Sequence, residues 1–370
     1  MTIASLPHSV PAAPTGTRMA MVDGDIHPKN RSDAELRPFL SNYWWDYMAT
    51  LGNRPRHGHA TGFPYPKSTP GAYRRDAWPQ AGGLPGSDLA MMRAQLLDPG
   101  NIAIGVLNPL SPSGHGDRNH DFAAAMSRAV NEWQLEYWTR PERRLRASIC
   151  IAFEDAPAAV AEIERCAPEA DFVQVLALTR TFEPPGQRRY WPIYEAAQAA
   201  GIPVGFHVFG YSGAPMTGAG WPSFYIEEVA AHAAGCQAVV SSLVLEGVFE
   251  RFPGLKIVLI EGGFGWIPSL AWRLDQMFER FRDEVPHLKR RPSEYIHDHF
   301  WVTTQPMEEA PKSSQVIDAM GWIGFDRILF ASDYPHWDFD DPARALPTRL
   351  TQAQREMIAF RNAQYVYRLS

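Results

Sequence analysis

Eight apolar runs recur along the chain from about residue 20 to its end, and stretches with helical periodicity separate them. Several of these runs are apolar nearly throughout and do not alternate with polar residues, which is typical of strands buried on both faces. Such strands belong to parallel sheets covered by helices, so the pattern predicts an α/β fold. The expected strands lie at 19–27, 101–110, 144–153, 170–178, 202–210, 255–263, 299–305 and 326–335, and the clearest helices at 119–138, 156–167, 191–201 and 351–366.

Eight strands that alternate with helices match the arrangement of a (β/α)8 barrel, or TIM barrel. The alternative is an open doubly wound sheet, in which a GxGxxG turn commonly follows the first strand. No such turn follows the first expected strand, so we prefer the barrel. We expect one barrel domain over residues 19–370, preceded by a loose leader at 1–18 that is rich in Pro, Ala, Ser and Thr.

A long insertion at residues 31–95 separates the first two expected strands and shows little periodicity. Its stretch 43–66 is rich in Trp, Tyr and Phe, and such side chains need burial, which argues against disorder. The insertion follows the carboxyl end of a strand, which is the catalytic face of a barrel. We interpret it as a lid over the barrel mouth or as a surface for a partner subunit.

The composition argues against several classes of partner. The net charge of −6 disfavours nucleic acid, whose phosphates need clustered Lys and Arg. No apolar run approaches the ~18 residues that span a bilayer, and residues 1–18 lack the basic start and apolar core of a secretory signal. The three cysteines show no paired spacing, which favours a reducing compartment. We therefore expect a cytoplasmic protein that binds neither nucleic acid nor membrane.

Acidic and imidazole side chains stand at the ends of several expected strands. Asp25 and His27 are two residues apart at the end of the first strand, and alternate residues of a strand share a face. The carboxyl ends of barrel strands open into one shared site. Polar residues at the ends of other strands should therefore meet this pair; they are His207 on the fifth strand, Glu261 on the sixth and Asp333 on the eighth.

This combination of side chains favours a metal site. Each residue alone has an ordinary explanation: His207 as a hydrogen-bonded core histidine, Asp333 as a turn residue and Glu261 as a loop anchor. Gathered in one buried place without a cation, however, the carboxylates would repel each other and lose their hydration. A divalent ion removes that penalty, and imidazole with carboxylate suits zinc, manganese or iron.

Four segments of the chain resemble a known family. They are similar to the amidohydrolase superfamily, in the branch called amidohydrolase 2, whose members are like aminocarboxymuconate-semialdehyde decarboxylase. The resemblance runs from about residue 20 to the C-terminus and covers 31–95 poorly. The segments are "VDGDIHP", "WPIYEAAQAAGIPVGFH", "LEGVFERFPGLKIVLIEGGFGWIPSLAWRLD" and "RILFASDYPHWDF".

The resemblance implies roles for these residues and also shows two departures. It implies that Asp25, His27 and His207 bind the metal and that Asp333 binds it and also acts as an acid/base group. The position on the sixth strand, commonly histidine in the family, is Glu261 here. The fourth strand carries Gln174 and no lysine, so the carbamylated lysine that bridges two ions in other members is missing, which favours a single ion.

A second ion stays open. Glu261 could be its ligand, and so could His336, which alternatively contacts substrate or orients a ligand. We expect Asp338 to hydrogen-bond the loop or an imidazole. The remaining histidines are expected to be structural or exposed: His232 packs or caps in a helical pattern, and His57 and His59 lie in the insertion.

The leading functional hypothesis is a metal-dependent hydrolase or decarboxylase that acts on a small, partly apolar substrate, with a carboxylate as the favoured kind. Its ion would be zinc by preference, with manganese or iron as alternatives. Asp333 would accept or deliver the proton, Glu261 would tune the charge of the metal or hold a water, and His336 would assist.

Two other functions stay open, and a plain binding module is poorly supported. One is an oxygen-activating enzyme with a dinuclear Fe/Fe or Mn/Fe centre on the same scaffold. The other is a metal-binding structural partner of a paralogous catalytic subunit. We accordingly expect either a homodimer or a hetero-oligomer with such a subunit.

Overall fold

The eight expected strands all form and follow each other around one sheet. A computed structural model of the chain describes residues 19–51, 72–115, 118–210 and 220–369. Every neighbouring pair of strands is parallel. The strands are β1 (Met21–Ile26), β2 (Ile102–Leu107), β3 (Leu145–Cys150), β4 (Phe172–Arg180), β5 (Val204–Gly210), β6 (Ile257–Ile260), β7 (Phe300–Thr303) and β8 (Ile328–Leu329).

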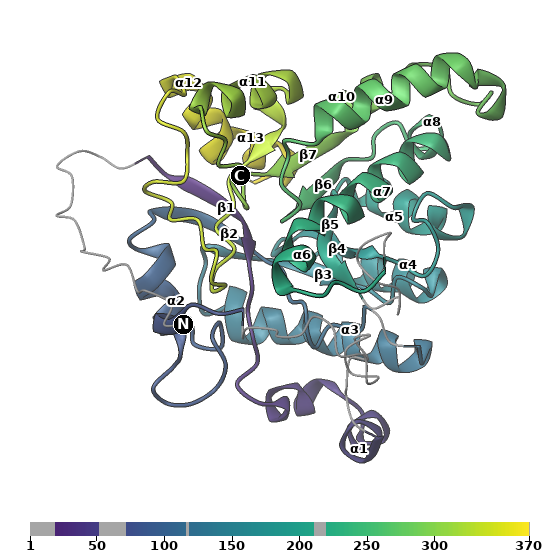
Figure 1. The fold of residues 1–370 in the computed structure, drawn as a ribbon. Coiled ribbons are helices and arrows are strands. Elements are labelled where there is room, and N and C mark those ends of the chain that lie inside the picture. The colour runs from purple at the N-terminus through teal and green to yellow at the C-terminus, as the bar shows by residue number, and fades with distance from the viewer. Residues whose placement is uncertain (1–18, 52–71, 116–117, 211–219, 370) are drawn as a thin grey trace.

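Backbone hydrogen bonds close the sheet on itself. The Gly24 N–H donates to the Phe330 carbonyl at 2.9 Å, and the Asp333 N–H donates to the Asp25 carbonyl at 3.1 Å. The segment that continues β8 is thus joined to β1, and Figure 1 shows β1, in purple, close to the yellow C-terminal part of the chain. The predicted (β/α)8 barrel is confirmed.

Helices surround the barrel and complete the expected alternation. The expected helix at 119–138 is α3 continued by a π-helical turn, η5, and the expected helix at 351–366 is α12, η9 and α13. Helix α5 ends at Gly201, whose φ of 70° is the left-handed cap that glycine adopts easily. The helices are α1 (Asn42–Leu51), α2 (Leu89–Met92), α3 (His120–Gln134), α4 (Ala156–Cys166), α5 (Trp191–Ala200), α6 (Tyr225–Ala230), α7 (His232–Leu245), α8 (Val248–Arg251), α9 (Ile267–Arg280), α10 (Pro292–His299), α11 (Ser313–Ile323), α12 (Gln352–Glu356) and α13 (Asn362–Val366). The shorter turns are η1 (Asp33–Phe39), η3 (Arg75–Ala77), η4 (Arg93–Leu97), η5 (Leu135–Thr139), η6 (Arg188–Tyr190), η7 (Arg282–Glu284), η8 (Phe325–Arg327) and η9 (Met357–Arg361).

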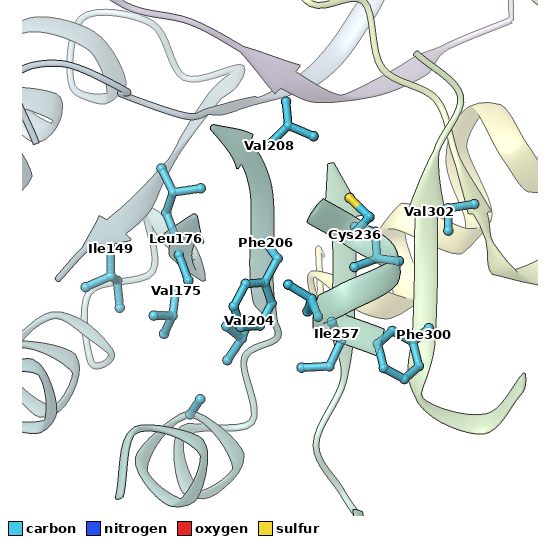
Figure 2. Close-up of a cluster of buried hydrophobic side chains, with 14 of the residues drawn as sticks. Ile149, Val175, Leu176, Val204, Phe206, Val208, Cys236, Ile257, Phe300 and Val302 are labelled. Carbon is cyan, nitrogen blue, oxygen red and sulfur yellow. The ribbon is translucent and has the colours of Figure 1, made fainter. Parts of the chain in front are cut away.

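Alternate side chains of β5 point in opposite directions, some into the apolar core and some into the barrel interior. Val204, Phe206 and Val208 belong to the large apolar cluster between the strands and the helices, and Figure 2 shows them beside apolar side chains of the neighbouring strands. His207 lies between them in the sequence and therefore faces the barrel interior. A second apolar cluster, which includes Val22, Val106, Val258, Trp301, Leu329 and Tyr367, fills that interior.

One helical stretch among the described residues, 225–245, is long and apolar enough to span a membrane by length and composition alone. In the structure its α7 part packs against β4 and β5. Val239, Val240 and Leu243 are buried there in the main apolar cluster. The apolar character of this stretch thus has an explanation within the barrel.

The insertion at 31–95 divides into two described parts. Its first part packs on α3, where the rings of Trp44 and Tyr47 lie 5.6 and 5.0 Å from the ring of Phe122; Figure 1 shows α1 beside α3. Its second part begins at residue 72 and contains η3 and α2. Residues 52–71, with His57 and His59, and the leader 1–18 lie outside the described residues, so the division into leader and domain stays a prediction.

Phe206 allows a test of the packing around β5. Its side chain is fully buried, and its ring lies 6.1 Å from that of Phe153. We expect Phe206→Ala to lower the free energy of unfolding by about 3–5 kcal/mol, because it leaves a cavity in a packed core. The matched control is Phe281→Ala, whose ring is 58% exposed. Urea denaturation of both variants is the measurement, and equal losses of stability would contradict this account.

Candidate metal centre

The structure brings all six predicted site residues together at the carboxyl ends of the strands. Asp25 lies on β1 and His27 just after it, His207 lies on β5, Glu261 follows β6, and Asp333 and His336 follow β8. Five of them are 4% exposed or less, and the side chain of His336 is 13% exposed. Residues scattered over three hundred positions thus lie together at the barrel mouth.

Two of these residues have a strained backbone. Glu261 has a φ of 61° and Asp333 a φ of 60°, in the left-handed region that residues other than glycine seldom occupy. Such a conformation costs on the order of 1–3 kcal/mol and persists where surrounding contacts hold it. The Glu261 N–H donates to Thr303 Oγ1 at 3.1 Å, and the Asp333 N–H to the Asp25 carbonyl. The neighbouring strands β7 and β1 therefore hold both residues in place.

Backbone carbonyls determine which nitrogen of each histidine is available. His27 Nδ1 donates to the Asn108 carbonyl at 2.9 Å, and His207 Nδ1 donates to the Val208 carbonyl at 2.7 Å. A carbonyl only accepts, so the Nδ1 atom must carry a proton in both rings. When the rings are neutral, each Nε2 keeps its lone pair and can bind an ion. Metal-ligating histidines are usually oriented in this way.

The free imidazole nitrogens face carboxylate oxygens at short range. His27 Nε2 lies 2.9 Å from Asp333 Oδ1 and 3.2 Å from Asp25 Oδ1. His207 Nε2 lies 2.8 Å from Glu261 Oε2 and 3.5 Å from Asp25 Oδ2. Neighbouring ligand atoms that bind one ion at about 2.1 Å and at right angles are ~3 Å apart, so these separations fit a shared ion.

The hydrogen-bond pattern gives a second test of the fit. Among the buried side-chain atoms of the described residues that make no hydrogen bond of acceptable geometry, four belong to candidate ligands: Asp25 Oδ2, His27 Nε2, His207 Nε2 and Glu261 Oε2. Buried polar atoms rarely lack a partner. Ligand atoms from these four residues all lie within 4.8 Å of one another, and so do those of a second group formed by His27, Glu261, Asp333 and His336. The donor set therefore suits a divalent ion, and the two groups overlap in His27 and Glu261.

The protonation equilibria of the site reflect an excess of carboxylates. Burial would raise the pKa of Asp25, but the charges of His27 and His207 outweigh it and hold that pKa below its ordinary value. Burial, together with the charge of Asp333, raises the pKa of Glu261. Burial raises the pKa of Asp333 to about 6, although His27 opposes the shift. Asp25, whose charged form is favoured, thus lies beside Glu261 and Asp333, whose charged forms are disfavoured. A cation would stabilise the charged form of all three.

Neighbouring carboxylates raise the pKa values of the two candidate histidine ligands of the first group. Burial would lower the pKa of His207, but the charges of Glu261 and Asp25 outweigh it and raise that pKa to about 10. Against the same effect of burial, Asp25 and Asp333 raise the pKa of His27 well above its ordinary value. In the metal-free protein, protons on these rings therefore supply part of the positive charge that the carboxylates need.

His336 lies at the edge of the cluster. Its Nδ1 is 2.5 Å from Asp333 Oδ1, and its ring centre is 4.5 Å from that of His27. Burial, with the nearby charge of His27, lowers its pKa to about 3. His336 thus contacts a candidate ligand directly, while its role as ligand, substrate contact or orienting group stays a prediction.

An amide side chain connects Asp333 with Asp338. Gln305 Nε2 donates to Asp333 Oδ2 at 3.2 Å and to Asp338 Oδ2 at 3.1 Å. We expected Asp338 to hydrogen-bond the loop or an imidazole; its carboxylate also accepts this hydrogen bond from Gln305. Gln305 was not among the expected site residues, because a glutamine after a strand carries no distinctive sequence signal.

Two further histidines lie near the site. His232, expected to pack or cap a helix, does pack on Phe209 at 4.8 Å between ring centres, and its Nδ1 also lies 3.7 Å from Glu261 Oε1. His115, in the segment between β2 and α3, is buried, and burial together with the charge of His207 lowers its pKa to about 4. Nothing in the sequence around His115 distinguishes it, because its position depends on the path of a long loop.

Comparison with known proteins shows to which family the chain belongs. Residues 22–369 match the family model described as Amidohydrolase. The chain belongs to this family. The predicted membership of the amidohydrolase superfamily is confirmed, and with it the prediction of a metal-dependent enzyme of the hydrolase or lyase type with a divalent ion.

Several relatives are decarboxylases. Gamma-resorcylate decarboxylase of Polaromonas sp. (strain JS666) is 28% identical over 303 residues, which cover 76% of this chain and 88% of that protein. A crystal structure of dihydroxybenzoic acid decarboxylase from Polaromonas sp. JS666, with bound manganese and the inhibitor 2-nitroresorcinol, matches with a TM-score of 0.67 and 21% identity, and covers 95% of this chain and 98% of that one. A structure of 5-carboxyvanillate decarboxylase from Novosphingobium aromaticivorans, complexed with manganese and 4-hydroxy-3-methoxy-5-nitrobenzoic acid, matches with a TM-score of 0.71 and 18% identity, and covers 95% and 96%.

Proton release on metal binding tests the electrostatics of the site. Because the pKa of His207 is about 10, its ring carries a proton at neutral pH in the metal-free protein, and that proton must leave before Nε2 can bind an ion. For each proton that metal binding releases, we expect the affinity for Mn²⁺ to fall about tenfold with every pH unit below pH 9. Calorimetry in buffers of different ionisation heat measures the number of protons. An affinity that does not vary with pH would contradict the assignment.

Proposed function

We propose that this protein is a metal-dependent decarboxylase of a small aromatic carboxylate. The observation that carries the proposal is the convergence of ligand atoms at the barrel mouth in two overlapping groups, one of Asp25, His27, His207 and Glu261 and one of His27, Glu261, Asp333 and His336. The decarboxylase relatives, one of them aligned over 76% of this chain, support this type of reaction and a substrate of this class.

Aromatic side chains around the site support an aromatic substrate. The ring of Tyr73 lies 5.7 Å from that of His336 and 6.0 Å from that of Trp78. Trp337 Nε1 donates to the hydroxyl of Tyr225 at 3.2 Å, which joins the segment after β8 to α6. A planar ring that enters the mouth can therefore stack on aromatic surfaces while its carboxylate faces the candidate ligands.

The second part of the insertion contributes to this mouth. The Arg74 N–H donates to the Pro335 carbonyl at 3.0 Å, and the Trp337 N–H donates to the Ala72 carbonyl at 3.1 Å. Residues from 72 onward are thus attached to the segment that carries Asp333 and His336. This attachment supports the role of a lid for the second part, whereas the first part packs on α3.

Decarboxylation breaks one carbon–carbon bond and adds one proton to the ring carbon. The bond between the ring carbon and the carboxylate breaks, carbon dioxide leaves, and the electron pair stays on the ring carbon, which takes up a proton. A divalent ion at this site would polarise the oxygens of the substrate and lower the energy of the charge that develops. Asp333 holds the proton for the ring carbon, and His336, whose Nδ1 contacts Asp333 Oδ1, keeps that carboxyl oriented.

Manganese and zinc are the ions that we propose, in that order. The preference for zinc derived from residue types alone finds no specific support, whereas relatives bind manganese in their structures. We propose one ion held by Asp25, His27, His207 and Asp333, with Glu261 as the residue that adjusts the charge around it. A second ion would use the overlapping group of His27, Glu261, Asp333 and His336.

Hydrolysis is the second candidate function. It is considered because Glu261 replaces a histidine that in the resembled branch commonly assists decarboxylation or hydrolysis, and a charged glutamate accepts a hydrogen bond from a water and donates none. The relatives give no support to the oxygen-activating alternative. A cytoplasmic location, and a homodimer or a complex with a paralogous subunit, remain part of the proposal; mass photometry of the purified protein tests the assembly.

A small panel of substrates tests the proposed reaction. Protein loaded with Mn²⁺ or Zn²⁺ is incubated with 2,6-dihydroxybenzoate, 5-carboxyvanillate and related phenolic carboxylates. We expect release of carbon dioxide and of the matching phenol from at least one of them. Hydrolysis of ester or amide analogues without carbon dioxide release would favour the second candidate, and oxygen consumption in an electrode would favour oxidation; either result would contradict the proposal.

Two substitutions test the roles of Asp333 and His207. We expect Asp333→Asn to lower kcat by about 10²- to 10⁴-fold, the usual contribution of a positioned acid or base, with the fold retained. We expect His207→Ala to lose the ion as well as turnover. Metal analysis and steady-state kinetics are the measurements, with His287→Ala, an exposed histidine on the surface, as control. Full activity together with full metal content in either variant would contradict these roles.

Tyr73 tests the contribution of the insertion to substrate binding. We expect Tyr73→Ala to raise KM by about tenfold with metal content unchanged, because a stacked aromatic contact is worth about 1 kcal/mol or slightly more. Tyr43→Ala on α1, whose ring is 67% exposed, is the matched control and should leave KM unchanged. If both substitutions had the same effect, Tyr73 would not line the substrate site.

A further inference from the structure

One buried asparagine contacts both candidate ligands that β1 supplies. Asn108 follows β2 directly and is fully buried. Its Nδ2 donates to Asp25 Oδ1 at 2.8 Å, and its backbone carbonyl accepts from His27 Nδ1 at 2.9 Å. Its own N–H donates to the Ile26 carbonyl at 2.7 Å, so the residue is fixed beside the strand that carries both ligands.

These two contacts determine which atoms of the ligands face the pocket. The amide occupies Asp25 Oδ1 and restricts the rotation of the carboxylate, which leaves Oδ2 directed toward His207 Nε2 at 3.5 Å. The carbonyl requires a proton on His27 Nδ1 and so leaves Nε2 for an ion. Asn108 thus orients one ligand through its side chain and the other through its backbone.

The orientation of the Asn108 amide is itself determined by donors from the next two strands. Its Oδ1 accepts from Ser148 Oγ on β3 and from Gln174 Nε2 on β4, both at 2.8 Å. Gln174 Nε2 also donates to Ser148 Oγ at 2.9 Å, which leaves the serine hydroxyl proton for Asn108. With the amide turned over, its NH2 group would face two donors and its oxygen would face the Asp25 carboxylate. Only one orientation therefore satisfies every partner.

At the end of this network, the Gln174 side chain lies against the backbone of Gly205 on β5. A Cβ atom on Gly205 would lie 2.6 Å from Gln174 Oε1, so glycine leaves the space that the glutamine occupies. A chain of polar side chains thus runs around the barrel from Asp25 on β1 to Gln174 on β4, below the candidate metal centre. This chain of side chains ends at Gln174 Oε1, which makes no hydrogen bond among the described residues.

We propose that Asn108 is a positioning residue of the metal centre, held by Ser148 and Gln174, and that it increases the affinity for the ion by pre-orienting Asp25. The inference rests on the proposed function only in that Asp25 and His27 bind a divalent ion. Residues that orient metal ligands typically change metal affinity by about 10- to 100-fold when they are replaced. Asn108 acts through Asp25 and has no contact of its own with the reacting atoms in this proposal.

The test compares two buried asparagines. Asn108→Ala removes the amide donor but keeps the backbone carbonyl that His27 needs. Asn131→Ala on α3 is the matched control: its side chain is also fully buried, donates to the Cys150 carbonyl at 2.9 Å and accepts from the Cys150 N–H at 2.8 Å, without touching a candidate ligand. Both variants lose buried hydrogen bonds, so both should lower the melting temperature. The free Mn²⁺ signal in electron paramagnetic resonance titrations gives the dissociation constant of each.

We expect Asn108→Ala to weaken Mn²⁺ binding by about 10- to 100-fold and Asn131→Ala to leave it at the wild-type value. Ser148→Ala, which touches no candidate ligand, provides a second variant if Asn108→Ala does not fold; it should weaken binding by a smaller factor. Unchanged affinity in the folded Asn108 or Ser148 variant, or equal weakening in Asn131→Ala, would overturn the inference. Failure of the wild type to decarboxylate any substrate would contradict the proposed function but leave these affinities, and the inference, standing.

Discussion

Crowding of negative charge inside the barrel is the constraint on which the rest of the site depends. Asp25, Glu261 and Asp333 are 4% exposed or less, and each lies within 4 Å of His27 Nε2. Two like charges about 4 Å apart repel by roughly 4 kcal/mol at the effective dielectric constant of a protein. Without an ion, protons on His27 and His207 relieve part of this repulsion. A divalent ion relieves more of it, because its charge is higher and all the ligand atoms can approach it together.

The barrel separates the residues that give stability from those that give chemistry. On β5, Phe206 packs outward in the main apolar cluster while the adjacent His207 faces the pocket. The same alternation on β6 puts Leu259 in the outer cluster and Ile260 in the inner one, immediately before Glu261. The backbone strain at Glu261 and Asp333 lies where these strands end. The stable parallel sheet can therefore hold the unfavourable conformations that direct both carboxylates into the mouth.

The sequence was sufficient to predict the barrel and the convergence of the main polar residues. Buried parallel strands are apolar throughout, so their runs stand out, and the spacing of Asp25 and His27 follows directly from strand geometry. His207, Glu261 and Asp333 could be placed with them because every barrel strand ends at the same face. These expectations required only the position of a residue within its own strand.

Residues that reach the site from elsewhere could not be predicted in this way. His232 begins α7, and its approach to Glu261 depends on where that helix packs on the barrel. Asn108 and Gln305 carry neutral amides, which have no distinctive pattern in a sequence, and their importance lies in partners 83 and 28 positions away along the chain. The insertion was interpreted as a lid or as a surface for a partner subunit, and the pattern did not indicate that its two described parts pack in different places, on α3 and at the barrel mouth.

The central claim is that side chains from separate strands of one barrel surround a common divalent ion. Crystals of the protein grown with Mn²⁺ and measured at the manganese absorption edge test it most directly. The account predicts an anomalous difference peak bonded to His27 Nε2, His207 Nε2 and an oxygen of Asp333. A fully occupied manganese peak elsewhere on the molecule, with no peak between these three side chains, would contradict it.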